Sequence, residues 1–252
     1  MVLNMERWKG KVAVVTGASA GIGAAIVEQL VQEGLIVIGL ARRIERIEDI
    51  SKNLSSSKGS LHGFKVDLRN TEDIISTFTA IENKFGPIHV LINNAGIVHN
   101  TTLMDGDIEK WKNVIDVNVM GLCVATREAI NSMRRNEVAG HIVHINSDLG
   151  HVIPSIPGLN VYPASKFAVS ALTEVLRGEL MRSGTKIKVT SVSPGLVGNT
   201  EIFCAAGGID SGIDKAPALH PEDVAEAVIY VLSTPPHVQV HDVILKPLGS
   251  GH

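Results

Sequence analysis

Short, continuous apolar runs alternate along the chain with longer segments of helical periodicity, and this alternation constrains the fold most. The predicted strands are Val12–Thr16, Ile36–Leu40, Gly63–Asp67, His89–Asn93, Ile142–Ser147, Lys188–Val192 and Asp242–Leu245. The predicted helices are Ala24–Gln32, Ile44–Leu54, Thr71–Phe85, Asp107–Arg134, Ala164–Arg182 and Pro221–Ser233. A strand that is apolar throughout is buried on both faces, as in a parallel sheet flanked by helices. The sequence therefore predicts an α/β fold with a doubly wound parallel sheet of about seven strands.

Length and composition favour one ordered domain spanning residues 1–252. The chain has 252 residues, 44% of them hydrophobic, and no composition shift marks a boundary. A net charge of -3 without a long basic run argues against a nucleic-acid partner. No apolar run approaches the ~20 residues of a membrane span. Because the first residues lack the apolar core of a signal peptide and only two cysteines are present, we expect a cytoplasmic location.

A glycine-rich turn links the first predicted strand to the first predicted helix. Glycines in such a turn let the backbone approach a pyrophosphate, and the helix N-terminus offers free N–H groups and partial positive charge. The alternative is a strand-to-helix turn without a ligand. We expect a dinucleotide to contact Gly17, Ser19, Ala20, Gly21, Ile22 and Gly23.

The end of the second predicted strand indicates which nicotinamide cofactor binds. An acid there would hydrogen-bond the ribose and repel a 2′-phosphate. The chain instead continues with Arg42 and Arg43, whose guanidinium groups suit phosphate. Ser19 would add a hydroxyl. This pattern favours NADP(H), with Arg42 as the preferred ligand, against the alternative that both arginines are simply a solvated helix start.

A tyrosine and a lysine spaced by one helical turn form the candidate reaction centre. Hydride transfer to a carbonyl requires a proton at the oxygen, and Tyr162 can donate it. A free phenol has a pKa of about 10, so Lys166 on the same helix face is expected to lower it. A lone Tyr-x3-Lys pattern is often a surface pair. Here Asn118 and Ser147 precede it in order.

The glycine pattern together with Asn118, Ser147, Tyr162 and Lys166 resembles the short-chain dehydrogenases/reductases over nearly the whole chain, from Gly10 to about Leu245. The resemblance implies a single-domain Rossmann fold. It makes Tyr162 the general acid/base, and Lys166 the residue that tunes Tyr162 and holds the nicotinamide ribose. Ser147 would orient the substrate oxygen, and Asn118 would anchor a water on the proton path.

The resemblance also implies further cofactor contacts. They are Asp67 and Leu68 at the adenine, Asn94, Ala95 and Gly96 beside the adenosine ribose, and Pro194, Gly195 and Val197 at the nicotinamide. Simpler alternatives are a capping aspartate at Asp67 and a plain turn at Asn94. The chain departs from the family at Asn199, where threonine is frequent and where Thr200 comes one place late. We therefore do not assign to this chain the cofactor contacts that this threonine makes in the family.

Two distinctive segments, Met5–Trp8 and Glu222–Pro235, resemble the farnesol dehydrogenase-like subgroup that includes dehydrogenase/reductase family member eleven. The resemblance implies NADP-dependent action on apolar alcohols, aldehydes or ketones, including isoprenoids and steroids. Between Ser147 and Tyr162 lies a mostly apolar loop, and we expect Leu149 and Ile153 to join these two residues at the substrate. The segment 198–218 is predicted to be a lid.

The central prediction is an NADP(H)-dependent oxidoreductase acting on an apolar alcohol or carbonyl, with farnesol or a related isoprenoid as the candidate substrate. A steroid or broad carbonyl reductase is the enzymatic alternative, and a non-catalytic NADP(H) sensor is the alternative of another class. Ten histidines show no metal-ligand spacing, so no metal site is predicted. By resemblance, the long helices Asp107–Arg134 and Ala164–Arg182 pair subunits into a homodimer or homotetramer.

Overall fold

The computed structural model describes residues 3–153, 156–198, 200–204 and 216–250. Within them, seven parallel strands form one sheet in the order β3-β2-β1-β4-β5-β6-β7. The strands are β1 Val12–Thr16, β2 Ile36–Ala41, β3 Ser60–Lys65, β4 Ile88–Asn93, β5 His141–Ile145, β6 Lys188–Pro194 and β7 Asp242–Leu245. The predicted single-domain, doubly wound Rossmann fold is confirmed.

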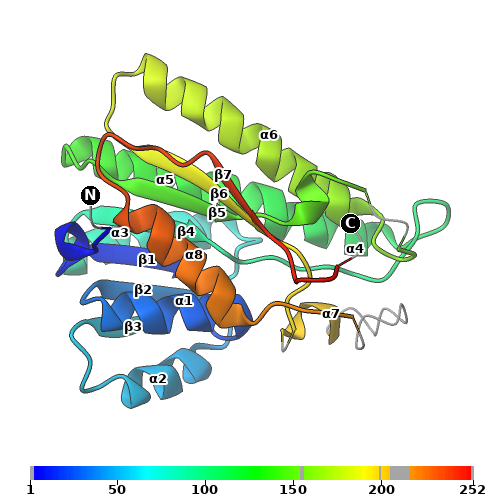
Figure 1. The fold of residues 1–252 in the computed structure, drawn as a ribbon, viewed down its shortest axis with the longest axis horizontal. Helices are drawn as coiled ribbons and strands as arrows, with labels where there is room; N and C mark the ends of the chain where they lie inside the picture. The colour runs from blue at the N-terminus through cyan, green and yellow to red at the C-terminus, as the bar shows by residue number, and fades with distance from the viewer. Residues whose placement is uncertain (1–2, 154–155, 199, 205–215, 251–252) are drawn as a thin grey trace.

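Helices cover both faces of the sheet (Figure 1). They are α1 Gly21–Gln32, α2 Ile44–Asn53, α3 Thr71–Phe85, α4 Ile108–Ile115, α5 Leu122–Arg135, α6 Val161–Arg182, α7 Glu201–Cys204 and α8 Pro221–Ser233. Short segments η1 Glu6–Trp8 and η3 Asp148–Gly150 are 3₁₀ turns, and η2 Asp116–Gly121 is a π-helix. No helix among the described residues is both long enough and apolar enough to cross a membrane.

The side chains of β1 explain why its sequence is apolar throughout. Ala13 and Val15 point into a core shared with α1 and α8, and Val12 and Val14 point into a second core shared with α3 and α5. All four are at most 2% exposed. Alternate side chains of one strand therefore fill two cores, as a doubly covered parallel sheet requires.

Several predicted boundaries were wrong, and helices α1 and α6 each begin three residues earlier than predicted. Strand β3 covers Ser60–Lys65 because it pairs in register with Ile36–Ala41 of β2, so Asp67 lies beyond it. Strand β5 ends at Ile145, and Ser147 begins the η3 turn instead. The predicted helix Asp107–Arg134 is α4, η2 and α5 in succession, with a π-helical insertion at its centre.

Candidate active site

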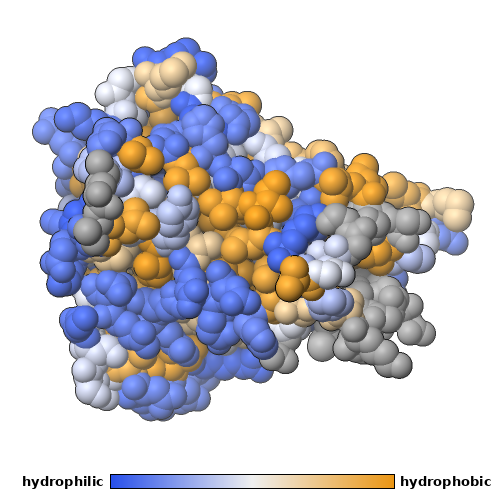
Figure 2. All heavy atoms as spheres, in the orientation of Figure 1, coloured by the Kyte–Doolittle hydropathy of each residue, from blue (hydrophilic) through white to orange (hydrophobic). Residues whose placement is uncertain are grey.

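A cleft of about 1490 Å³ opens at the carboxyl ends of the strands. The strand order reverses around β1, which lies between β2 and β4, and ligands of open α/β sheets bind at such a switch point. Figure 2 shows apolar residues reaching the surface along the middle of the face that carries β7 and α8. The cleft is lined by every predicted site residue except Asn118: Gly17, Ser19, Ala20, Gly21, Ile22, Gly23, Arg42, Arg43, Asp67, Leu68, Asn94, Ala95, Gly96, Ser147, Leu149, Ile153, Tyr162, Lys166, Pro194, Gly195 and Val197.

The glycine turn has no room for side chains. Gly17 has a φ of +69°, and a Cβ there would lie 2.9 Å from the Cα of Ala95. A Cβ on Gly23 would lie 2.2 Å from the carbonyl oxygen of Gly17. Real Cβ atoms do not approach other atoms so closely, and only glycine relieves both contacts. The turn therefore brings bare backbone to the edge of the cleft.

The start of helix α1 fits an anionic ligand. Its N-cap residue, Ala20, has no side chain that accepts a hydrogen bond from the helix. Helices α3 and α4 are capped instead by the side chains of Asn70 and Asp107. The first residues of α1 line the cleft, and among the described residues no side chain caps this helix start, which suits the diphosphate of a dinucleotide.

The end of β4 is fastened to the end of β1 by hydrogen bonds. The Thr16 hydroxyl accepts from the backbone N–H groups of Asn94 and Ala95, each at 3.0 Å. The Asn94 side chain donates to the carbonyl oxygen of Thr16 at 2.9 Å. Sequence reasoning missed this role of Thr16. A hydroxyl that ends an otherwise apolar strand was the available signal.

The two predicted arginine ligands differ in their surroundings. Arg42 is exposed, and within the part of the chain that the structure describes no hydrogen bond or ion pair engages it. Arg43 donates to Glu201 at 2.6 Å. Asp67 is paired with Arg69 at 2.5 Å, and hydrogen bonds from Arg69 lower the pKa of its carboxyl group. The Asp67 carboxylate also accepts from the backbone of Arg69, which is the turn-capping role left open above.

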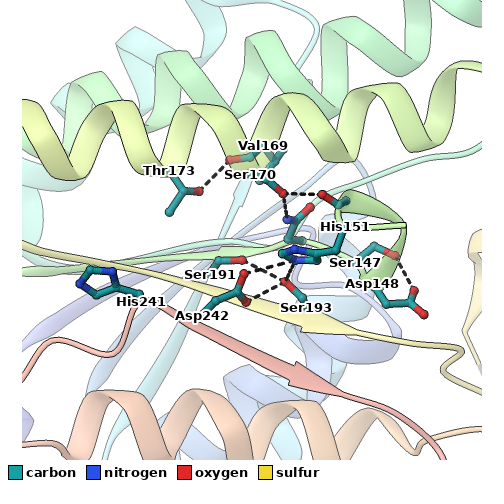
Figure 3. A network of polar contacts seen from close by, with 12 residues as sticks. Ser147, Asp148, His151, Val169, Ser170, Thr173, Ser191, Ser193, His241 and Asp242 are labelled. Carbon is teal, nitrogen blue, oxygen red and sulfur yellow. Dashed lines mark hydrogen bonds and ion pairs between the residues drawn. The ribbon is translucent and has the colours of Figure 1, made fainter. Parts of the chain in front are cut away.

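Ser147, Tyr162 and Lys166 converge at the floor of the cleft. Tyr162 is 6% exposed and Lys166 is 5% exposed. The hydroxyl of Ser147 accepts from the backbone N–H of Leu149 at 3.1 Å. It also donates to the carboxylate of Asp148 at 3.3 Å, as Figure 3 shows. Lys166 Nζ donates to the carbonyl oxygen of Ile145 at 3.0 Å.

Burial dominates the proton affinities at this centre. It raises the pKa of Tyr162 to about 12, while the neighbouring Ser147 side chain acts in the opposite direction and the Asp148 carboxylate raises that pKa further. Burial also lowers the pKa of Lys166 to about 8. In the protein alone, burial thus outweighs any lowering of the pKa of Tyr162 that was expected from Lys166. Lys166 Nζ points at a carbonyl oxygen, 5.8 Å from the centre of the phenol ring, and its own charge is disfavoured by burial.

Asn118 lies in the π-helix, 2% exposed and behind the cleft wall. Its side chain accepts from the N–H of Ile97 at 2.8 Å and donates to the carbonyl oxygen of Ile97 at 2.9 Å. It also donates to Ser165 at 3.1 Å. A Cβ on Gly96 would lie 3.6 Å from Asn118 Oδ1 and 3.8 Å from Lys166 Nζ. Asn118 therefore fixes the backbone beside Lys166, and π-helical insertions often occur at functional sites.

The substrate side of the cleft is apolar. Val98 and Leu159 pack against Tyr162, with Leu149 and Ile202 beside them. Ile153 lines the cleft and is 79% exposed. Sequence reasoning missed Val98 and placed Leu159 only as one member of the mostly apolar loop, since apolar loop residues carry no periodic signal.

A polar network holds the loop that follows Ser147 against the sheet (Figure 3). His151 Nε2 lies 3.0 Å from the hydroxyl of Ser193 on β6 and 3.2 Å from the carboxylate of Asp242 on β7. Ser193 donates to the same carboxylate at 3.0 Å. None of these residues was predicted. The network anchors the segment that carries Ser147 and Leu149.

The predicted lid is described only in part. Asn199, where the chain departs from the family pattern, and residues 205–215 lie outside the described residues. The described part includes Thr200 and the helix α7, and Val197 forms a β-bridge with Leu219.

Comparison with known proteins identifies the family. Residues 11–206 match the model for short chain dehydrogenases. A farnesol dehydrogenase of Aedes aegypti is 51% identical over 97% of this chain and 99% of its own length. Dehydrogenase/reductase SDR family member 11 of Mus musculus is 46% identical over 97% of this chain and 96% of its own length.

A solved structure agrees with these relatives. Serine dehydrogenase in its closed form, complexed with NADP⁺, superimposes with a TM-score of 0.86 at 33% identity, covering 96% of each chain. The fold, the cleft at its switch point and the two relatives lead to one conclusion. The chain belongs to the short-chain dehydrogenase/reductase family, within its farnesol dehydrogenase-like subgroup.

Proposed function

We propose that this protein is an NADP(H)-dependent oxidoreductase that transfers hydride between nicotinamide and an apolar alcohol or carbonyl, with farnesol or a related isoprenoid as substrate. One observation carries the proposal. The side chains of Ser147, Tyr162 and Lys166 line the same cleft that the glycine turn borders. The chain is an oxidoreductase of the short-chain dehydrogenase/reductase family. The cofactor form and the substrate are the proposed parts.

The bound nicotinamide supplies a two-electron hydride acceptor or donor, and the chain handles the proton. Ser147 holds the substrate oxygen, and Tyr162 takes its proton during oxidation and returns it during reduction. With the pKa of Tyr162 at about 12, a positive charge close to the phenol favours this exchange near neutrality. Lys166 carries that charge below its own pKa of about 8. Asn118 supports the proton path by fixing the backbone at Ile97.

The surroundings of the arginines support NADP(H) over NAD(H). Strand β2 ends at Ala41, and Arg42 follows without an ion-pair partner among the described residues. A free guanidinium binds a phosphate through paired, charge-assisted hydrogen bonds. The predicted cofactor contacts at Asp67, Leu68, Pro194 and Val197 remain part of this proposal.

Apolar walls and one relative support the isoprenoid substrate. The substrate side of the cleft is lined by apolar side chains, namely Leu149, Ile153, Val98 and Leu159. Beyond the catalytic hydroxyl groups, few groups there can hydrogen-bond a substrate. The relative from Aedes aegypti is named for farnesol. A steroid or broad carbonyl reductase would use the same catalytic groups and differ only in how these walls fit the substrate.

The test is a substrate panel run in both directions. Farnesol with NADP⁺ is compared with NADPH and a set of steroid ketones, quinones and aldehydes. We expect turnover of farnesol. Activity confined to steroid or quinone carbonyls would retain the mechanism and replace the substrate. NADPH binding without turnover of any compound would overturn the enzymatic proposal in favour of a cofactor sensor.

We further propose a cytoplasmic homodimer or homotetramer. Exposed apolar side chains lie along the predicted pairing helices, namely Ile108, Met120, Phe167, Val175 and Met181. Such a surface suits a subunit interface. The scarcity of cysteines favours a reducing compartment. Multi-angle light scattering tests the assembly, and a monomer at micromolar concentration would contradict it.

A further inference from the structure

Glu201, the first residue of α7, is held by two arginines from the start of α2. Arg43 Nη2 lies 2.6 Å from one carboxylate oxygen, and Arg46 Nη1 lies 2.5 Å from the other. Each oxygen thus receives its own guanidinium at the length of a charge-assisted hydrogen bond. The partners are 158 and 155 residues apart in the sequence. The contact therefore joins the segment after β6 to the segment after β2.

The neighbouring residue brings α7 onto the glycine turn. A Cβ on Gly21 would lie 3.3 Å from Thr200 Cγ2, so the side chain of Thr200 covers the start of α1. Thr200, Glu201, Arg42 and Arg43 all line the same cleft. The Glu201 carboxylate is therefore part of the cofactor cleft, on the side where β2 ends.

Glu201 and a phosphate would use the same donors. The guanidinium of Arg43 presents a planar fork that suits one carboxylate or one phosphate at a time. Its side chain and that of Glu201 are each 48% exposed, so water competes and the pair exchanges readily. Arg46 holds the second carboxylate oxygen, which keeps the negative charge beside Arg43. Hydrogen bonds from both arginines lower the pKa of Glu201, so the carboxylate stays ionised near neutrality.

We propose that Glu201 is a specificity-determining residue that competes with the 2′-phosphate of the cofactor for Arg43 and so weakens NADP(H) binding selectively. This inference rests on the proposed NADP(H) site. Arg42 remains available to bind the phosphate, while Arg43 stays paired with Glu201. The moderated affinity favours release of the cofactor after each turnover, a step that often limits such enzymes.

The test measures binding without catalysis. Adenosine 2′,5′-bisphosphate and adenosine 5′-monophosphate are titrated by calorimetry into wild type, Glu201→Gln and Glu45→Gln. Glu45 is the matched control, because it is an exposed acid in the first turn of α2, and no ion pair engages it in the described structure. We expect Glu201→Gln to bind the bisphosphate about fivefold more tightly. Binding of the monophosphate should be unchanged, and Glu45→Gln should match wild type.

A double variant isolates the competition for Arg43. The double variant Arg43→Gln/Glu201→Gln is compared with the single variant Arg43→Gln. If Glu201 acts through Arg43, these two proteins bind the bisphosphate equally tightly. Unchanged or weaker bisphosphate binding in Glu201→Gln, with wild type still preferring the bisphosphate, would overturn this inference alone. A wild type that does not distinguish the bisphosphate from the monophosphate would overturn the proposed NADP(H) preference, and this inference with it.

Discussion

At the scale of the residue, burial sets the chemistry of the catalytic groups. The sequence predicted which side chains meet, because Ser147, Tyr162 and Lys166 occur at the ordered positions of a known family. It did not predict their proton affinities, which depend on how deeply each group lies in the folded protein. Nor did it predict Asp148 or Glu201, since single acids in loops carry no pattern.

Replacing Asp148 tests the electrostatics of Tyr162. The chain has two tyrosines, so a Tyr230→Phe background leaves Tyr162 as the reporter. Removing the Asp148 charge should lower the pKa of Tyr162 below its value of about 12. Alkaline absorbance titration of Asp148→Asn in that background should give tyrosinate at lower pH, with circular dichroism monitoring the fold. Asp49→Asn, at an exposed acid of α2, is the control. An equal or higher midpoint for Asp148→Asn would refute the effect of this charge.

At the scale of the element, the glycine turn was predicted more accurately than the strands around it. Three glycines after a buried strand are a local signal, and the turn forms where they lie. The limits of β3 come from pairing with β2, and β3 carries the half-buried pattern of an edge strand. The π-helix around Asn118 is likewise a tertiary feature, which helical periodicity does not reveal.

Two glycine-to-alanine changes within helices test the close packing of the turn. Gly23→Ala would place a Cβ against the carbonyl oxygen of Gly17 and should lower the free energy of unfolding by about 2 kcal/mol or more. The matched change is Gly178→Ala in α6, where the nearest atom, 3.1 Å away, belongs to the flexible side chain of Arg182. It should be neutral or stabilise by up to about 1 kcal/mol. Urea denaturation measures both, and equal stability of the two variants would contradict the packing argument.

At the scale of the whole molecule, the sheet holds buried histidines that stay neutral. His141 and His144 lie on β5, at most 1% exposed. Burial lowers the pKa of His144 to about 3 and that of His141 well below its ordinary value. His141 Nε2 is hydrogen-bonded to the hydroxyl of Thr190, and His144 Nδ1 to the hydroxyl of Thr173, each at 2.9 Å. The sequence showed ten histidines without showing which ones the two cores would enclose.

These histidines predict loss of stability in mild acid. In the unfolded chain they gain protons near their ordinary pKa of about 6.5, whereas the folded protein excludes those protons until much lower pH. The unfolded state therefore binds more protons, and the free energy of unfolding falls as the pH drops below about 6.5. Urea denaturation at a series of pH values should show this slope. His144→Gln should reduce it, and His237→Gln, at an exposed position, should not. A slope that His144→Gln leaves unchanged would exclude His144 as its source.

The central claim is that Tyr162 exchanges a proton while the cleft transfers hydride to NADP⁺. The most direct measurement is farnesol-dependent reduction of NADP⁺ and of NAD⁺, by wild type and by Tyr162→Phe, with NADPH binding measured alongside. We predict that wild type reduces NADP⁺ in preference to NAD⁺. We predict that Tyr162→Phe still binds NADPH but turns over at least about 100-fold more slowly. Turnover near the wild-type rate in Tyr162→Phe would contradict the assigned acid/base, and a preference for NAD⁺ would contradict the role of Arg42.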